Sequence, residues 1–170
     1  MTEPSVQRTS WSRIVFFGVL PGLALVLALA AGFLKFTDAT DRVTQTAGSA
    51  SVAAARDAAV ALLTYQPDSV ERQLDAAQDR LTGSFRDSYS SLTRDVVIPG
   101  AKQQHVSTVA TVPAAASVSA TENHAQVLLF IDQTATVGDA KGAPTATRST
   151  VLVTLDKVGG RWLVSGFEPK

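Results

Sequence analysis

An uninterrupted apolar segment over residues 14–34 constrains this chain more than any other feature. It reads IVFFGVLPGLALVLALAAGFL and holds no charged, amide or hydroxyl side chain. A helix of this length, rising about 1.5 Å per residue, matches the thickness of a bilayer's hydrocarbon layer. The sequence therefore predicts a short arm over residues 1–13, a transmembrane anchor over 14–36 and one water-soluble domain over 37–170.

A cleaved secretory signal is the alternative to an anchor. Arg8 and Arg13 supply a basic start, and the Ala-Leu-Ala at 28–30 resembles a cleavage site. The apolar run continues through Leu34, past that site, and is longer than the roughly 7–15-residue apolar core of a signal. Its length therefore favours an uncleaved anchor.

The charges beside the apolar segment are nearly balanced and do not fix its orientation. Arg8 and Arg13 precede the segment, and Lys35 and Arg42 follow it. A short basic arm before a first span usually stays in the cytoplasm, and a long following domain is exported largely regardless of charge. We therefore expect a single-pass plasma-membrane protein with a cytoplasmic N-terminus and an extracytoplasmic domain.

The composition after residue 36 excludes several classes of function. This part carries 12 Lys and Arg against 14 Asp and Glu, so it has no basic field for nucleic acid. The chain has no cysteine, which rules out disulfides and thiolate metal sites. It also lacks a glycine-rich phosphate loop, a nucleophile elbow and a zinc motif. We therefore expect no cofactor and no bound metal.

Apolar residues at helical spacing predict two helices before residue 82. The first runs over 38–65 and ends before Pro67, which disfavours a helical conformation at the preceding residue. Its predicted apolar stripe is Val43, Ala47, Ala50, Ala54, Ala58, Ala61 and Tyr65. The second helix begins at Asp68, with Glu71 completing a capping-box pattern. Its predicted buried face is Val70, Leu74, Ala77 and Leu81.

A third helix begins at Ser84 and is expected to end at residues 97–100, where Pro99 and Gly100 lie. Its apolar residues at helical spacing are Phe85, Tyr89, Leu92 and Val96.

From residue 104 the apolar period changes to two, which predicts about four antiparallel strands. They cover residues 104–112, 125–137, 148–158 and 161–167. Pro113 marks an edge, a bulge or a bend, after which 114–120 resumes the first strand, and Gly159-Gly160 makes a tight hairpin. On the last strand Trp162 and Val164 share one face, which Gly166 would continue. Three helices covering one face of an antiparallel sheet is an α+β fold.

In their order, short motifs along nearly the whole chain resemble the actinobacterial Mce-associated membrane proteins, which accompany mammalian-cell-entry (Mce) lipid-import systems. The motifs are Leu62-Leu63-Thr64-Tyr65, Asp68, Leu81-Thr82-Gly83-Ser84-Phe85, Tyr89, Val97-Ile98-Pro99-Gly100-Ala101 and Gly160-Arg161-Trp162-Leu163-Val164. The family often has Tyr-Asp or Tyr-x-Tyr after the leucines, whereas this chain reads Tyr-Gln-Pro-Asp from residue 65. That departure leaves open which transporter the protein serves.

The resemblance implies a nuclear-transport-factor-like cone, in which helices pack on a curved four-stranded sheet. The same fold is seen in an inner-membrane subunit of type IV secretion systems. It also implies a non-catalytic accessory subunit that stabilises or assembles an Mce-type complex. The implied partners are the membrane, Mce transporter subunits or other envelope proteins, with a lipid or a second copy of the chain as further possibilities.

An isomerase-like enzyme is a less favoured hypothesis, because a cone fold can also enclose a base and a proton donor. Asp132 would be the base if its side faced the interior. However, it lies opposite Val127, Leu129 and Ile131, and a solvent-facing position is favoured. Tyr65 and Tyr89 are candidate donors that fit core roles better, and exposed positions are expected for His105 and His124.

A lipid-binding module that uses the cone cavity is the second hypothesis. Phe85, Phe130 and Phe167 either line such a pocket or fill the interior. Filling is favoured because only 6% of residues are aromatic and a core needs them, and Trp162 is expected to pack in that core. The sequence therefore predicts no catalytic, cofactor-binding or metal-binding residues.

Overall fold

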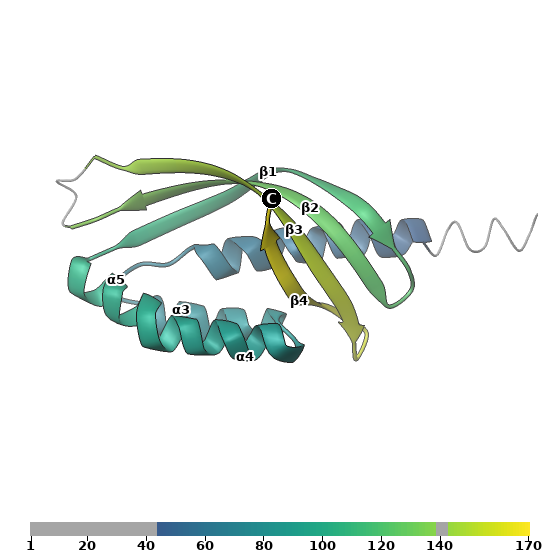
Figure 1. The fold of residues 1–170 in the computed structure, drawn as a ribbon, viewed down its shortest axis with the longest axis horizontal. Helices are drawn as coiled ribbons and strands as arrows, with labels where there is room; N and C mark the ends of the chain where they lie inside the picture. Colours follow the sequence, from purple (N-terminus) through teal and green to yellow (C-terminus); the bar gives the residue numbers. More distant parts are fainter. Residues whose placement is uncertain (1–43, 139–142) are drawn as a thin grey trace, which may run out of the picture. The chain divides into compact units, whose positions relative to one another are not determined.

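A computed structural model describes residues 44–138 and 143–170 (Figure 1). The expected arm and anchor, and the start of the first predicted helix up to residue 43, lie outside these residues. None of the helices in the described part of the chain is long and apolar enough to cross a membrane.

The first described helix spans residues 44–63 and packs small side chains against the sheet. Its buried positions are Ala47, Gly48, Ser51, Ala55, Ala58, Ala59 and Leu62. The predicted stripe is therefore wrong at Ala50, which is exposed, and right at Ala47 and Ala58. Alanines occur on every side of this helix, so their spacing alone does not determine which side is buried.

Helix α3 (Val70–Ala77) continues into a 3₁₀ turn, Gln78–Arg80. All four residues of its predicted buried face are buried, which confirms that face. The predicted capping box is wrong. The N-cap is Ser69, and its hydroxyl donates to Oε1 of Gln73 at 3.0 Å.

Helix α4 (Gly83–Leu92) does not end at residues 97–100 as predicted. It continues through a π-helical turn (Thr93–Val97) into α5 (Ile98–Gln104). Proline lacks the N–H that an α-helix interior needs, and the wider π turn places Pro99 at the start of a new helix, where no such N–H is required.

The inward face of this long helix follows Phe85, Tyr89 and Thr93, a spacing of four residues. Leu92 and Val96 were expected on that face but are 54% and 60% exposed. A regular α-helix has 3.6 residues per turn, so residues spaced by four move gradually around its circumference. The wider π turn compensates for this shift.

The sheet is an antiparallel meander in the order β1-β2-β3-β4. The strands are β1 (Ser107–Ala120), β2 (His124–Thr136), β3 (Thr145–Val158) and β4 (Arg161–Pro169). The four predicted strands are thus confirmed. Gly159 and Gly160 make the predicted turn with φ of 58° and 81°, in the left-handed region that favours glycine.

Bulges bend the long strands over the helices, which all lie on one side of the sheet (Figure 1). The register of β1 shifts at Pro113, as predicted, and again at Val118. A third shift lies at Ser165 in β4. It places Phe167 rather than the expected Gly166 on the face of Val164, because Phe167 pairs with the buried Val153.

The main core lies between the sheet and the helices. Val127, Leu129, Val153 and Leu155 on the sheet are completely buried. From the helical side, Ala55, Ala58, Ala59, Leu62, Ala77 and Leu81 contribute to the same core. Burying each large aliphatic side chain stabilises the fold by about 1.5–3 kcal/mol. A second cluster, formed by Val70, Leu74 and Ala101, joins α3 to α5.

Candidate functional site

Aromatic side chains occupy the part of the interior between α4 and β4, where the lipid-binding alternative would need a cavity. Phe85 and Phe167 stack with ring centroids 6.3 Å apart and planes 12° from parallel, and both pack against the core. Trp162 also packs there, and Lys157 Nζ lies 5.8 Å from the centre of its ring. The prediction that aromatic residues fill this core is confirmed for these three rings. The lipid-binding hypothesis thereby loses this part of the interior as its site.

Phe130 is the exception, because it lies on the opposite face of the sheet and is 46% exposed. It pairs with Ala114 on one side and with Thr150 on the other. Leu128, the next outward residue of β2, pairs with Ala116 and Leu152. Together these side chains form a contiguous apolar surface, which we call the outer patch: Ala114, Ala116, Leu128, Phe130 and Leu152.

Asp132 also lies on this outer face, as the alternation of β2 predicted. Its Oδ1 is 3.2 Å from Nε of Arg148, and the Asp132 side chain is half exposed. A carboxylate in this position cannot serve as a buried base inside the cone. The isomerase hypothesis therefore loses its proposed base. The outer patch instead has an ion pair at its border.

A hollow of about 340 Å³ lies beside Phe130, between the outer patch and the end of the chain. Its lining residues are Phe130, Ile131, Asp132, Arg148, Ser149, Thr150 and Lys170. Lys170 forms an ion pair with Glu168 at 3.1 Å. Because each cation lies beside a carboxylate, this border is polar but close to neutral.

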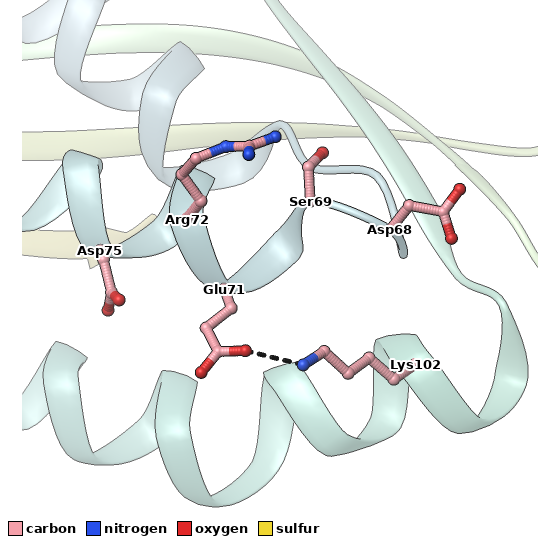
Figure 2. Close-up of a pocket in the computed structure, with 6 residues that line it drawn as sticks. All are labelled: Asp68, Ser69, Glu71, Arg72, Asp75 and Lys102. Atoms are coloured by element: carbon pink, nitrogen blue, oxygen red, sulfur yellow. Dashed lines mark hydrogen bonds and ion pairs between the residues drawn. The ribbon is translucent and has the colours of Figure 1, made fainter.

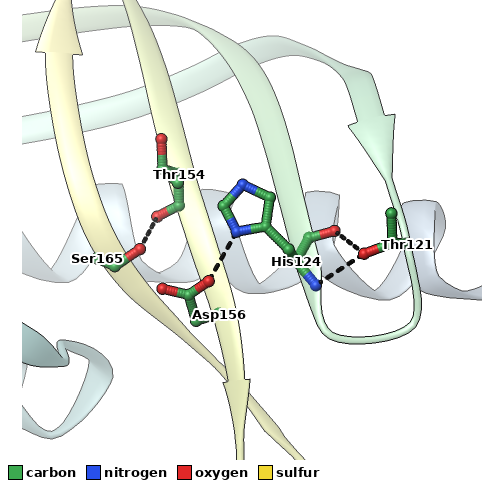
Figure 3. A network of polar contacts seen from close by, with 5 residues as sticks. All are labelled: Thr121, His124, Thr154, Asp156 and Ser165. Carbon is green, nitrogen blue, oxygen red and sulfur yellow. Dashed lines mark hydrogen bonds and ion pairs between the residues drawn. The ribbon is translucent and has the colours of Figure 1, made fainter.

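A polar network joins β2, β3 and β4 near the other end of the outer face (Figure 3). His124 Nδ1 lies 2.7 Å from Oδ1 of Asp156. Hydrogen bonds from His124 and, to a lesser extent, from Ser165 hold the pKa of Asp156 below its usual value. Ser165 bonds to the carboxylate and to the Thr154 carbonyl at 3.5 Å, so histidine does not activate its hydroxyl. The network is therefore structural.

An open polar groove of about 410 Å³ lies between α3 and α5 (Figure 2). Lys102 Nζ is 2.7 Å from a carboxylate oxygen of Glu71, which lowers the pKa of Glu71 by hydrogen bonding and charge. Both side chains are more than half exposed. The sequence interpretation missed this pair because α5 was expected to be a helix end. An exposed ion pair of this kind contributes little to stability.

The remaining candidate residues have structural positions. Tyr89 Oη donates to the carbonyl of Leu62 at 3.2 Å, and burial raises the pKa of this phenol. The backbone N–H of Tyr65 donates to the carbonyl of Thr108 at 3.0 Å. His105 ends α5 with a left-handed backbone, and both histidines are exposed as expected. In the described ranges, no three His, Cys, Asp or Glu side chains lie close enough to hold a metal.

Comparison with known protein families identifies the family of this chain. The family described as "Uncharacterized protein Rv1363c/MT1408-like" matches residues 17–168. The chain belongs to this family. A similar relative is "Outer membrane protein Rv1973" of Mycobacterium tuberculosis (strain ATCC 25618 / H37Rv). It is 56% identical over 160 residues, which cover 94% of this family member and 99% of that protein. Neither description mentions Mce transport, so the Mce association stays a prediction.

Solved structures with low sequence identity share the fold. An IcmL-like type IV secretion system protein from Legionella pneumophila matches with a TM-score of 0.59 and 12% identity. The match covers 70% of this chain and 88% of that one. The periplasmic domain of DotI matches with a TM-score of 0.60 and 18% identity, covering 72% and 94%. At the level of fold, the predicted relation to type IV secretion proteins is confirmed.

Proposed function

We propose that this protein is a non-catalytic accessory subunit of the cell envelope that stabilises or assembles an Mce-type lipid-import complex. Residues 14–36 anchor it in the plasma membrane, residues 1–13 are cytoplasmic, and residues 37–170 lie outside. Its domain has the nuclear-transport-factor-like class of fold. It binds a partner subunit through the outer patch.

The observation that carries this proposal is the position of Phe130. Phe130 is 46% exposed and is the largest side chain of the outer patch, and contiguous exposed apolar patches are typical of interaction sites. It lies among four further apolar residues on the sheet face that points away from the helices. Aromatic anchors surrounded by smaller apolar residues and a polar rim are typical of protein–protein interfaces. The packing of Phe85, Phe167 and Trp162 against the core also favours binding at the surface over catalysis inside.

The comparisons support an envelope location. The relative Rv1973 is named an outer membrane protein. Two structural neighbours are described as a type IV secretion system protein and a periplasmic domain. Because the apolar segment over 14–34 is long enough for a spanning helix, we place the anchor in the plasma membrane. Separation of the plasma membrane from the outer membrane by density, followed by immunodetection, tests this placement. Recovery with the outer-membrane fraction would contradict it.

Affinity purification of the full chain from native membranes in mild detergent tests the proposed partners. We expect Mce or permease subunits to co-purify with the wild-type protein. Phe130→Asp should reduce their recovery about tenfold, because a buried carboxylate at an interface costs more than 1.4 kcal/mol.

Val158→Asp is the matched control for this experiment. Val158 is 49% exposed on β3, near the Gly159-Gly160 turn and away from the outer patch. Its variant should recover the same partners as the wild type. If the wild-type protein recovered no Mce or permease subunit, the proposed complex would be wrong. If Phe130→Asp retained every partner, the outer patch would not be the contact.

A further inference from the structure

A second apolar surface lies where the described part of the chain begins. It is an open groove of about 600 Å³ between the first turns of the 44–63 helix and the end of β1. The groove is lined by Thr44, Gln45, Gly48, Ser49, Val52, Ser117, Val118, Ser119 and Ala120. Its volume lies within the range of small-molecule binding sites, roughly 300–1,000 Å³.

Two local features shape this groove. Gly48 has no side chain, and a Cβ built there would lie 3.4 Å from Oγ of Ser117, so helix and strand approach closely. Val118 is the extra residue of a bulge between Ser117 and Ser119, and it is 58% exposed. The bulge removes Val118 from regular pairing with β2 and leaves its side chain at the groove.

The lining determines the class of ligand. Val52, Val118 and Ala120 give it an apolar surface, whereas its other side chains carry hydroxyls or one amide. None of the lining residues is charged. Such a groove suits an apolar chain with uncharged oxygen acceptors, because hydroxyls and amides donate hydrogen bonds to ester carbonyls. It has no cation to hold a phosphate group or an acidic peptide.

Chain length sets an upper limit on the distance between this groove and the proposed anchor. Nine residues separate Leu34, the last residue of the apolar segment, from Thr44 at the groove. Even fully extended, this connection reaches no more than about 35 Å. We infer that the groove binds an acyl chain and the adjoining ester of a diacyl lipid from the bilayer that holds the anchor. This inference rests on the proposed membrane anchor.

Photolabelling of the full chain in lipid vesicles tests the inference. The vesicles contain phosphatidylethanolamine and phosphatidylglycerol, with a small fraction of phosphatidylethanolamine that carries a diazirine on one acyl chain. After irradiation, mass spectrometry locates the labelled peptides. We expect label on peptides from 44–52 and 117–120 as well as on the anchor.

Val118→Asp should lower the groove labelling about tenfold, because a carboxylate disfavours an apolar ligand. Val118→Trp, which fills the groove without adding charge, should lower it similarly. Val109→Asp is the matched control, because Val109 is 49% exposed on the same strand and does not line the groove. This control should label like the wild type. Thermal unfolding shows whether each variant keeps the fold. If one of the two Val118 variants has lost it, the test rests on the other.

Three results would overturn the inference. The first is label confined to the anchor peptide. The second is unchanged groove labelling in folded Val118 variants. The third is efficient disulfide-linked dimerisation of Val118→Cys in this otherwise cysteine-free chain, which would identify a second copy as the occupant. Carbonate extraction and partner recovery are measured on the same preparations. Loss of groove label with anchoring and partners intact overturns only the lipid site. Loss of anchoring or of partners overturns the proposed function.

Discussion

His124 and Asp156 face each other across β2 and β3, with Nδ1 of the imidazole 2.7 Å from Oδ1 of the carboxylate (Figure 3). An ionised carboxylate only accepts hydrogen bonds, so this nitrogen of His124 carries the proton and donates it. The pair joins the start of β2 to β3, and Ser165 brings β4 into the same network.

This pair predicts a dependence of stability on acid. Its hydrogen bonds lower the pKa of Asp156 in the folded state, whereas the pKa of an unfolded aspartate is about 3.9. The stabilisation is therefore present above about pH 4 and is lost as the pH falls through the lower folded pKa. Because the pair is exposed, Asp156→Asn should cost no more than about 1 kcal/mol at pH 7. Urea unfolding should show a smaller difference from wild type at pH 3, and an equal difference at both pH values would contradict this assignment.

Neighbouring leucines on β2 should respond very differently to truncation. Leu129 is completely buried in the core, whereas Leu128 points to the outer patch. We expect Leu129→Ala to lower the free energy of unfolding by about 2–5 kcal/mol, because it leaves a cavity. Leu128→Ala should cost less than about 1 kcal/mol, since partly exposed sites lose little burial. Urea denaturation measures both, and similar costs would mean that the two faces of β2 are assigned wrongly.

Tyr89 should stabilise the contact between α4 and the 44–63 helix through its hydroxyl. Tyr89→Phe removes the bond to the Leu62 carbonyl and should cost about 0.5–1.5 kcal/mol. Burial raises the pKa of Tyr89, so this stabilisation is present below about pH 10, where unfolded tyrosine titrates, and declines as the pH rises further. Thermal unfolding between pH 8 and pH 11 checks both effects. A variant with wild-type stability and the same alkaline decline would contradict the role of this hydroxyl.

Two glycines should respond to alanine with opposite signs. Gly160 has φ of 81° in the β3–β4 turn, so Gly160→Ala should destabilise the fold by about 1–2 kcal/mol. Gly100 lies inside α5, and a Cβ placed there meets no atom within 4 Å. Gly100→Ala should therefore stabilise the fold by about 0.5–1 kcal/mol. Chemical denaturation of the two variants decides this, and a stabilised Gly160→Ala would rule out the turn conformation described above.

The β half of the fold could be predicted well because alternation defines both faces of a strand at once. Val127, Leu129 and Ile131 are buried, and Asp132 lies on the other face, as their order indicated. The bulge at Pro113 also follows from proline's missing N–H. The bulge at Ser165 has no comparable sequence signal, so simple alternation continued the face of Val164 to Gly166 instead of Phe167.

The helical half was harder to predict for two physical reasons. Alanine lies on every side of the 44–63 helix, so the sequence does not indicate which side is buried. The π turn before Pro99 lets the helix continue where the sequence predicted its end. The Glu71–Lys102 pair depends on that continuation, because Lys102 lies on α5. The outer patch also needed structural information. Alternation placed Phe130 on the face of Asp132, but only the register shows that Ala114 pairs with Phe130 and that Ala116 and Leu152 pair with Leu128.

The most direct test of the central claim is site-specific photocrosslinking in living cells. A photoreactive phenylalanine analogue replaces Phe130 in the full chain. As a control, the same analogue replaces Val60, which is 37% exposed on the 44–63 helix. Crosslinked species are purified and identified by mass spectrometry. We predict that position 130 crosslinks to an Mce or permease subunit and that position 60 does not. Crosslinks at position 60 alone, or none at position 130 in a correctly located protein, would contradict binding through the outer patch.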